Sequence, residues 1–192
     1  VSLWLVMLSS TENLSALGSG KYILENLFNW TAGVIGKDED EERLVRTALS
    51  CSVRCNWIGS LGFHPFNISD LQQLVEDTTK RLKIDDQPWQ VITVELLVLE
   101  AFLAEMIVYV GEDFGERVLN SVVLPLLAHQ HPDVQDSASQ LMSFIVRNII
   151  HSEEKLSSIV TLCTKLLEDQ SSLVRRIGGV KGLASMINAT VL

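Results

Sequence analysis

Apolar residues recur at three- and four-residue intervals through most of the chain, and no segment sustains an alternation of apolar and polar residues. The first spacing is typical of helices with one buried face, whereas alternation is typical of half-buried strands. The pattern therefore predicts an all-α chain. Eight helices are predicted, at Ile23–Ile35, Arg43–Leu61, Leu71–Leu82, Trp89–Val110, Arg117–His129, Val134–Ile150, Leu156–Leu167 and Val174–Ile187.

Residues that commonly start or stop helices agree with these boundaries. Pro88 and Pro132 suit a first helical turn, where the missing N–H costs nothing. Ser152 precedes two glutamates, which place negative charge at the positive end of a helix dipole. Gly111 and Gly115 are expected to bracket a break between two helices.

The predicted helices form a repeating unit, in which a helix and a turn with aspartate or proline precede a second helix that begins with valine. The four valines are Val45, Val91, Val134 and Val174, at separations of 40 to 46 residues. A period of about 40 residues is typical of stacked helix pairs. One pair cannot bury its apolar faces alone, so each pair is expected to stack on the next.

Two of these units resemble the HEAT repeat family and the related armadillo repeats. "VLPLLAHQHPDVQDSASQLM" is similar to the HEAT pattern of a proline-containing first helix, a Pro-Asp turn, and then valine and small residues. "LLEDQSSLVRRIGGVKGLASMI" resembles it with Asp169 at the turn. Gln135 stands where the family usually has arginine, and the first unit lacks a proline turn. The unit at 69–110 is a fair match, and the one before residue 62 is weak.

The resemblance implies a right-handed α-solenoid, or superhelix, of about four stacked HEAT-like helix pairs. The chain would then be a single repeat domain, residues 1–192, with units at approximately 1–62, 63–111, 112–151 and 152–192. The implied function is that of a protein–protein interaction scaffold or adaptor, whose curved inner face is built mainly from the second helices. Two alternatives stay open: the regulatory solenoid of a large kinase or ligase, and a carrier of the nuclear-transport type.

Two features inside the last two units need a packing explanation. Pro125 is expected to kink the first helix of its pair, because it removes one backbone hydrogen bond. Gly178, Gly179 and Gly182 should each cost about 1 kcal/mol in a helix interior relative to alanine. We expect the close approach of a neighbouring helix to compensate for them.

Charge and composition narrow the class of protein. A formal net charge of −9 argues against direct nucleic-acid binding, and three cysteines do not form a disulfide framework, which favours a cytoplasmic or nuclear protein. The apolar run Val91–Val110 carries Glu95, Glu100 and Glu105, so a buried helix is predicted there rather than a membrane span. Both ends, "VSLWLVML" and "SMINATVL", are apolar, which predicts a fragment of a longer chain with further repeats or a partner covering at least one end.

Candidate catalytic and metal-binding motifs are weak. "LGSGKY" departs from a phosphate-binding loop, because Ser15 and Tyr22 replace two of its defining residues. Cys51 and Cys55 lie one helical turn apart and are expected to be small buried residues rather than metal ligands. "DEDEE" at 38–42 is interpreted as a solvated loop whose charges favour the start of the following helix, and an acidic interaction patch is the alternative. The sequence predicts no enzyme, no cofactor and no metal; four Asn-x-Ser/Thr sequons, including Asn188, leave glycosylation open.

A basic cluster in the last unit is the one candidate binding site. Arg175, Arg176 and Lys181 are its members. The two arginines lie about 100° apart around a helix, so both cannot be in the core. One interpretation has one arginine packed against the Asp169 turn and the other in solvent. The alternative is a docking site for a protein partner.

Overall fold

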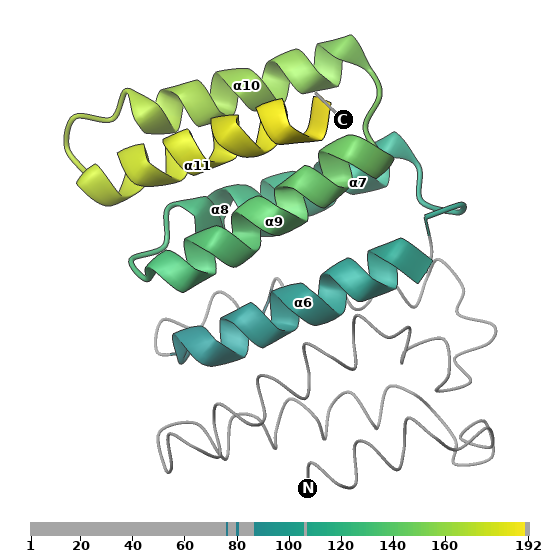
Figure 1. Ribbon diagram of the computed structural model, residues 1–192, viewed down its shortest axis with the longest axis horizontal. Helices are drawn as coiled ribbons and strands as arrows, with labels where there is room; N and C mark the ends of the chain where they lie inside the picture. Colours follow the sequence, from purple (N-terminus) through teal and green to yellow (C-terminus); the bar gives the residue numbers. More distant parts are fainter. Residues whose placement is uncertain (1–75, 77–79, 81–86, 106, 191–192) are drawn as a thin grey trace, which may run out of the picture. The chain divides into compact units, whose positions relative to one another are not determined.

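The computed structural model describes residues 76, 80, 87–105 and 107–190, and all of the regular structure among them is helical. The prediction of an all-α chain is confirmed for this part, in which no residue lies in a strand. The predicted helices before residue 87 lie outside the described residues, apart from Glu76 and Lys80, which are both helical. The helices are α6 (Trp89–Glu105), α7 (Glu112–Val118), α8 (Leu124–Leu127), α9 (Pro132–Asn148), α10 (Glu153–Leu167) and α11 (Leu173–Thr190), and the π-helical segment η2 (Leu119–Val123) joins α7 to α8 (Figure 1).

The helix α6 belongs to one compact unit of the chain, and α7 to α11 belong to another. The residues of α6 that are almost fully buried are Val91, Ile92, Thr93, Val94, Glu95, Leu96, Leu99 and Leu103. The prediction of a buried helix is therefore confirmed, but its end at Val110 is wrong, because residues 107–109 form a turn. No glycine or proline occurs between residues 89 and 110, so the sequence held no stop signal. None of the described helices combines the length and apolar character needed to cross a bilayer.

The helix α7 starts earlier than predicted and leads into a wide π turn, η2. It begins at Glu112 rather than Arg117, after the extended residue Gly111. The expected break at Gly115 is wrong, since this residue lies inside α7, where an added Cβ would be 2.7 Å from Cγ2 of Ile149. Close packing, and not helix termination, explains that glycine.

The proline in the same first helix follows a π-helical segment. The N–H of Leu124 donates to the carbonyl of Leu119, five residues earlier, and Pro125 comes next. A proline lacks the N–H of the regular ladder, and its ring clashes with the carbonyl four residues before it. The wider π turn places that carbonyl differently, so the chain continues in helix through α8.

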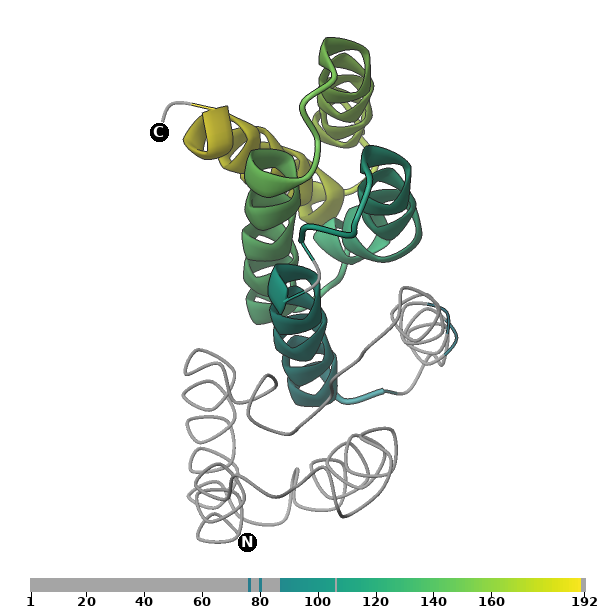
Figure 2. The same cartoon turned by 90° about the vertical axis from the view of Figure 1, so that its right-hand side faces the viewer.

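Two antiparallel helix pairs follow each other in the second unit. The segment from α7 to α8 pairs with α9, and α10 pairs with α11 (Figure 1). Figure 2 shows α7, α8 and α10 on one side of this unit and α9 and α11 on the other. α11 packs against α9, α10 and α8. The fully buried large side chains of this unit are Leu119, Leu127, Leu141, Met142 and Ile145.

Three glycines allow α11 to approach both α8 and α10. An added Cβ at Gly178 would be 1.8 Å from the backbone oxygen of Leu127, the last residue of α8. At Gly179 it would be 2.8 Å from the backbone oxygen of Cys163 in α10, and at Gly182 it would be 2.7 Å from Sγ of the same cysteine. The expectation that a neighbouring helix compensates for these glycines is confirmed. No other residue has a side chain small enough for these contacts.

Candidate protein-binding site

Arg175 lies in the first turn of α11 and pairs with the turn that precedes this helix. Its Nη1 lies 2.7 Å from Oδ2 of Asp169, and its side chain is half exposed. Asp169 also accepts hydrogen bonds from the backbone N–H and the hydroxyl of Ser171. These bonds from Ser171, and then the charges of Arg175 and Arg176, lower the pKa of the Asp169 carboxyl. The interpretation that one arginine packs against the Asp169 turn therefore fits Arg175.

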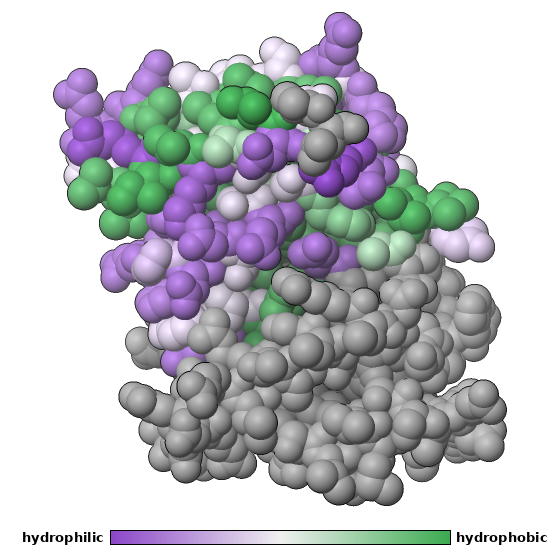
Figure 3. Space-filling model, in the orientation of Figure 1, coloured by the Kyte–Doolittle hydropathy of each residue, from purple (hydrophilic) through white to green (hydrophobic). Residues whose placement is uncertain are grey.

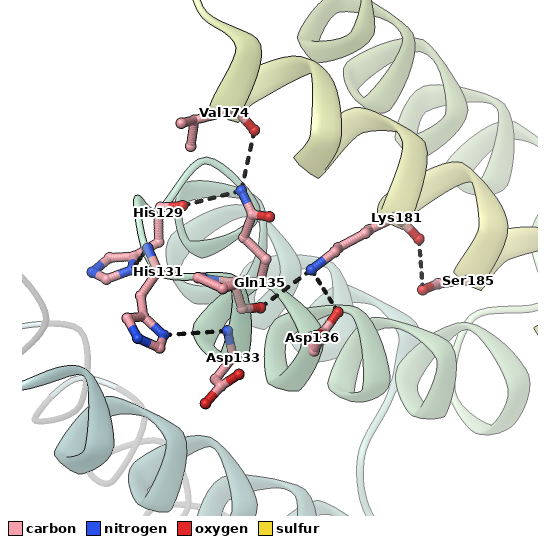
Figure 4. Close-up of polar contacts among 9 residues, drawn as sticks. His129, His131, Asp133, Gln135, Asp136, Val174, Lys181 and Ser185 are labelled. Atoms are coloured by element: carbon pink, nitrogen blue, oxygen red, sulfur yellow. Dashed lines mark hydrogen bonds and ion pairs between the residues drawn. The ribbon is translucent and has the colours of Figure 1, made fainter.

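Lys181 links α11 to the start of α9. Its Nζ lies 2.6 Å from Oδ1 of Asp136 and 3.2 Å from the carbonyl oxygen of Pro132 (Figure 4). Both partners lie in the first turns of α9, where Pro132 is the first helical residue, as predicted. Much of the Lys181 side chain is shielded from solvent. This lysine stabilises the contact between two helices, and its charge is balanced there.

Arg176 is the member of the predicted cluster that faces solvent. Within residues 107–190, no carboxylate forms an ion pair with it. The three basic side chains thus have three different surroundings. Arg175 pairs with Asp169 in the turn, Lys181 pairs with Asp136 in α9, and Arg176 extends into solvent. This separation follows from their positions around one helix, since residues one apart differ by about 100°.

Gln135 makes a buried link between the two helix pairs that the sequence had not indicated. Its Nε2 donates to the carbonyl oxygens of His129, at 3.0 Å, and of Val174, at 3.1 Å (Figure 4). The first acceptor lies before α9, and the second lies in the first turn of α11. The sequence had marked Gln135 only as a departure from arginine. The available signal in the sequence was a polar residue at the start of an otherwise apolar helix face. It did not identify the hydrogen-bond partners of Gln135, which lie 6 and 39 residues away.

The two histidines of the same turn act as hydrogen-bond acceptors. Nδ1 of His129 accepts from the N–H of His131, at 3.0 Å, and Nδ1 of His131 accepts from the N–H of Asp133, at 3.3 Å. The second bond caps the start of α9. These contacts give both histidines a structural role in the turn between α8 and α9. Burial, followed by the charge of His131, lowers the pKa of His129.

On the opposite side of the unit, acidic residues of α7 contact the start of α10. Oε1 of Glu112 accepts from the backbone N–H groups of His151, at 2.9 Å, and Ser152, at 3.1 Å. The side chain of Ser152 itself makes no capping hydrogen bond, so the carboxylate of Glu112 caps the start of α10 instead. Lys155 forms ion pairs with Asp113 and, at 3.2 Å, with Glu116. The hydrogen bond between Lys155 and Asp113 is the main reason that the pKa of the lysine is raised and that of the aspartate lowered.

α11 also exposes large apolar side chains. Leu173 is 62% exposed, Val180 is 52% exposed and Ile187 is 61% exposed, and Ile177 is 41% exposed. Figure 3 shows apolar side chains gathered over α10 and α11 on the visible face of the second unit. The sequence predicted a helix with one buried face here, but it did not show that a second apolar face is left uncovered. We call these four residues the α11 stripe.

The described residues hold no group of three or more His, Cys, Asp and Glu side chains placed to bind a metal ion. Cys163 is a free, buried thiol, and burial raises its pKa to about 11, so it stays protonated at neutral pH. The "GSGK" segment, Cys51, Cys55 and the "DEDEE" loop lie outside the described residues. No protein-family model, curated protein or solved structure matches the chain. Function is therefore inferred from the geometry of α7 to α11.

Proposed function

We propose that this chain is a segment of an α-solenoid of about four HEAT-like helix pairs, which serves as a scaffold or adaptor that binds other proteins. One observation carries the proposal. The helix pair α7–α9 is followed by the pair α10–α11 with the same order, and both helices of the second pair begin 41 residues after their counterparts, Glu153 after Glu112 and Leu173 after Pro132. The first helices share one layer and the second helices share the other (Figure 2).

Contacts between the pairs support the same proposal. Glu112 reaches the start of α10 at separations of 39 and 40 residues, and Gln135 reaches α11 at a separation of 39. Arg147 donates to the carbonyl of Asn188, at a separation of 41. Polar side chains thus join equivalent helices of successive pairs in both layers. A stack held by nearest-neighbour contacts of this kind is what a helical repeat array requires.

A solenoid offers its partners an extended face rather than an enclosed pocket. We place the binding surface on the second helices, here α9 and α11, and the partners are other proteins rather than nucleic acid or lipid. The role is binding and not catalysis, with no metal or cofactor taking part. The free thiol of Cys163 is compatible with the cytoplasmic or nuclear location that we propose.

Arg176 is the residue of the basic cluster best suited to a partner. Arg175 and Lys181 already have carboxylate partners within the chain, whereas Arg176 is exposed. Replacing Arg175 would also break its ion pair with the Asp169 turn, so a binding defect in that variant would have two explanations. The substitution Arg176→Glu changes the charge of an exposed side chain without breaking an ion pair among the described residues, so its effect on binding can be measured without a loss of stability.

The test is affinity purification of the native full-length protein, followed by a binding measurement with the purified partner. Arg176→Glu should weaken that complex while leaving the melting temperature unchanged. Lys165→Glu is the matched control, because Lys165 is an exposed residue of α10 and its replacement makes the same change of charge. Failure to recover any specific protein partner with the full-length protein would contradict the scaffold function.

A further inference from the structure

The α11 stripe forms a continuous apolar face along the exposed side of the helix. Leu173, Ile177, Val180 and Ile187 are spaced by four, three and seven residues, which keeps them on one face through four turns. The opposite side of α11 carries the glycines that pack against α8 and α10. Most of the surface of Leu173, Val180 and Ile187 therefore lies in solvent rather than in the packing of this unit. Contiguous exposed apolar surface of this kind typically marks an interaction site.

α9 shows that the fold does not require such a face. Its exposed side chains include Asp136, Gln140 and Arg147, all of them polar. Both α9 and α11 are second helices of their pairs and lie in the same layer (Figure 2). The apolar character of the exposed side is thus a property of α11, and its removal should not affect folding.

The charge around the stripe is positive, although the chain as a whole carries −9. α11 contains no aspartate or glutamate between Leu173 and Thr190. Arg176 lies three residues after Leu173 and four before Val180, so it lies beside the stripe. The ion pair of Lys181 with Asp136 borders the other side and contributes little net charge. An occupant with carboxylates along one edge of its apolar face complements this arrangement.

We infer that the α11 stripe is the docking site for an acidic amphipathic helix of a partner protein. This inference rests on the proposed protein-binding function and names the partner's chemistry. A helix matches a straight apolar face several turns long, with its own apolar residues at three- and four-residue spacing. Its glutamates or aspartates would lie next to Arg176.

Two other occupants fit less well. Two-fold pairing of α11 with a second copy would place two helices without acidic residues against each other, so neither copy would supply a carboxylate to Arg176. An anionic membrane would attract the arginine but repel a chain of net charge −9. The acidic helix satisfies the apolar face and the local charge together.

The experiment uses the full 192-residue chain and two designed fluorescent peptides of about 18 residues, or five helical turns. Both carry leucine at helical spacing, and they differ only in flanking residues, glutamate in one and lysine in the other. Binding is measured by anisotropy for the wild type, Val180→Asp and Arg176→Glu. Ser158→Asp and Lys165→Glu, on exposed positions of α10, are the matched controls. Circular dichroism and melting temperature establish that each variant is folded.

The wild type should bind the glutamate peptide at least about tenfold more tightly than the lysine peptide. Val180→Asp should weaken binding of the glutamate peptide by about tenfold or more, and Arg176→Glu should reverse the preference, whereas the controls should behave like the wild type. Equal binding of both peptides, or full binding by Val180→Asp, overturns the inference. So does self-association or binding to phosphatidylserine vesicles that Val180→Asp abolishes.

Failure of the docking-site inference can be distinguished from failure of the proposed scaffold function. If a native protein partner binds Val180→Asp as tightly as the wild type, the scaffold function stands and the α11 stripe is not its docking site. If the full-length protein has no specific protein partner, the proposed function itself fails.

Discussion

At the scale of single residues, burial and close contact explain why particular side chains occupy their positions. Gly178 is small because the carbonyl of Leu127 lies where its Cβ would be. Burial lowers the pKa of His129, and its Nδ1 accepts a backbone hydrogen bond from His131. Both residues lead to predictions that can be tested with one substitution each.

Gly178→Ala should destabilise the protein, even though alanine is the better helix former by about 1 kcal/mol. A Cβ at 1.8 Å from a backbone oxygen forces the two helices apart, which should cost about 2 kcal/mol net. Urea unfolding measures the change. Gly111→Ser is the control, because nothing lies within 4 Å of an added Cβ there and serine suits the position before a helix. An unchanged or higher stability of Gly178→Ala would show that α11 can shift without loss.

Protonation of His129 should lower the stability of the protein as the pH falls below 6.5. Its pKa in the folded state is below the value of 6.5 in the unfolded chain, so the unfolded chain binds the extra proton first. Stability is therefore unaffected above pH 6.5 and decreases between that pH and the lower folded pKa. In His129→Asn, whose side-chain oxygen can still accept from the N–H of His131, the decrease should be smaller than in the wild type. Chemical denaturation at several pH values makes the comparison, and equal decreases would contradict it.

At the scale of helices, a few long-range polar contacts fix how successive pairs align. Glu112 caps α10 from α7, and Gln135 binds carbonyls before α9 and within α11. Apolar packing alone allows helices to slide, because it is not directional. Hydrogen bonds of fixed geometry select one alignment, and they leave unpaired groups if it is lost.

Gln135→Leu should destabilise the protein by about 2 to 3 kcal/mol, since it leaves the carbonyls of His129 and Val174 without this buried donor. Gln140→Leu, on the exposed side of α9, should change stability by no more than about 0.5 kcal/mol. The free energies of unfolding in urea give both values. Similar effects of the two substitutions would show that the bonds of Gln135 add nothing beyond packing.

At the scale of the whole molecule, stacked helix pairs account for the repeated spacing of contacts near 40 residues. The two described pairs bury apolar surface against each other, and polar links join their equivalent helices. If the proposed solenoid extends through all four units, the whole chain has the same secondary structure as its described part.

Far-UV circular dichroism of the 192-residue protein should show a predominantly helical spectrum without a strand component. The reason is that the residues before position 87 have the same three- and four-residue apolar spacing as α7 to α11. Urea unfolding monitored by the same circular dichroism signal reports whether the helical structure unfolds cooperatively. A substantial strand contribution would contradict a solenoid of four helix pairs.

The sequence alone determined the helical class, the place of the last two turns and the need for close packing at Gly178, Gly179 and Gly182. These features depend on residues near each other in the chain: apolar spacing, Pro132 at the start of a helix, and glycines where a helix would otherwise avoid them. Only the tertiary structure showed that Gly115 packs rather than ends a helix, that Glu112 caps α10, and that Lys181 pairs with Asp136 of α9. Contacts between residues about 40 positions apart decide these roles, and local patterns carry no information about which of them form.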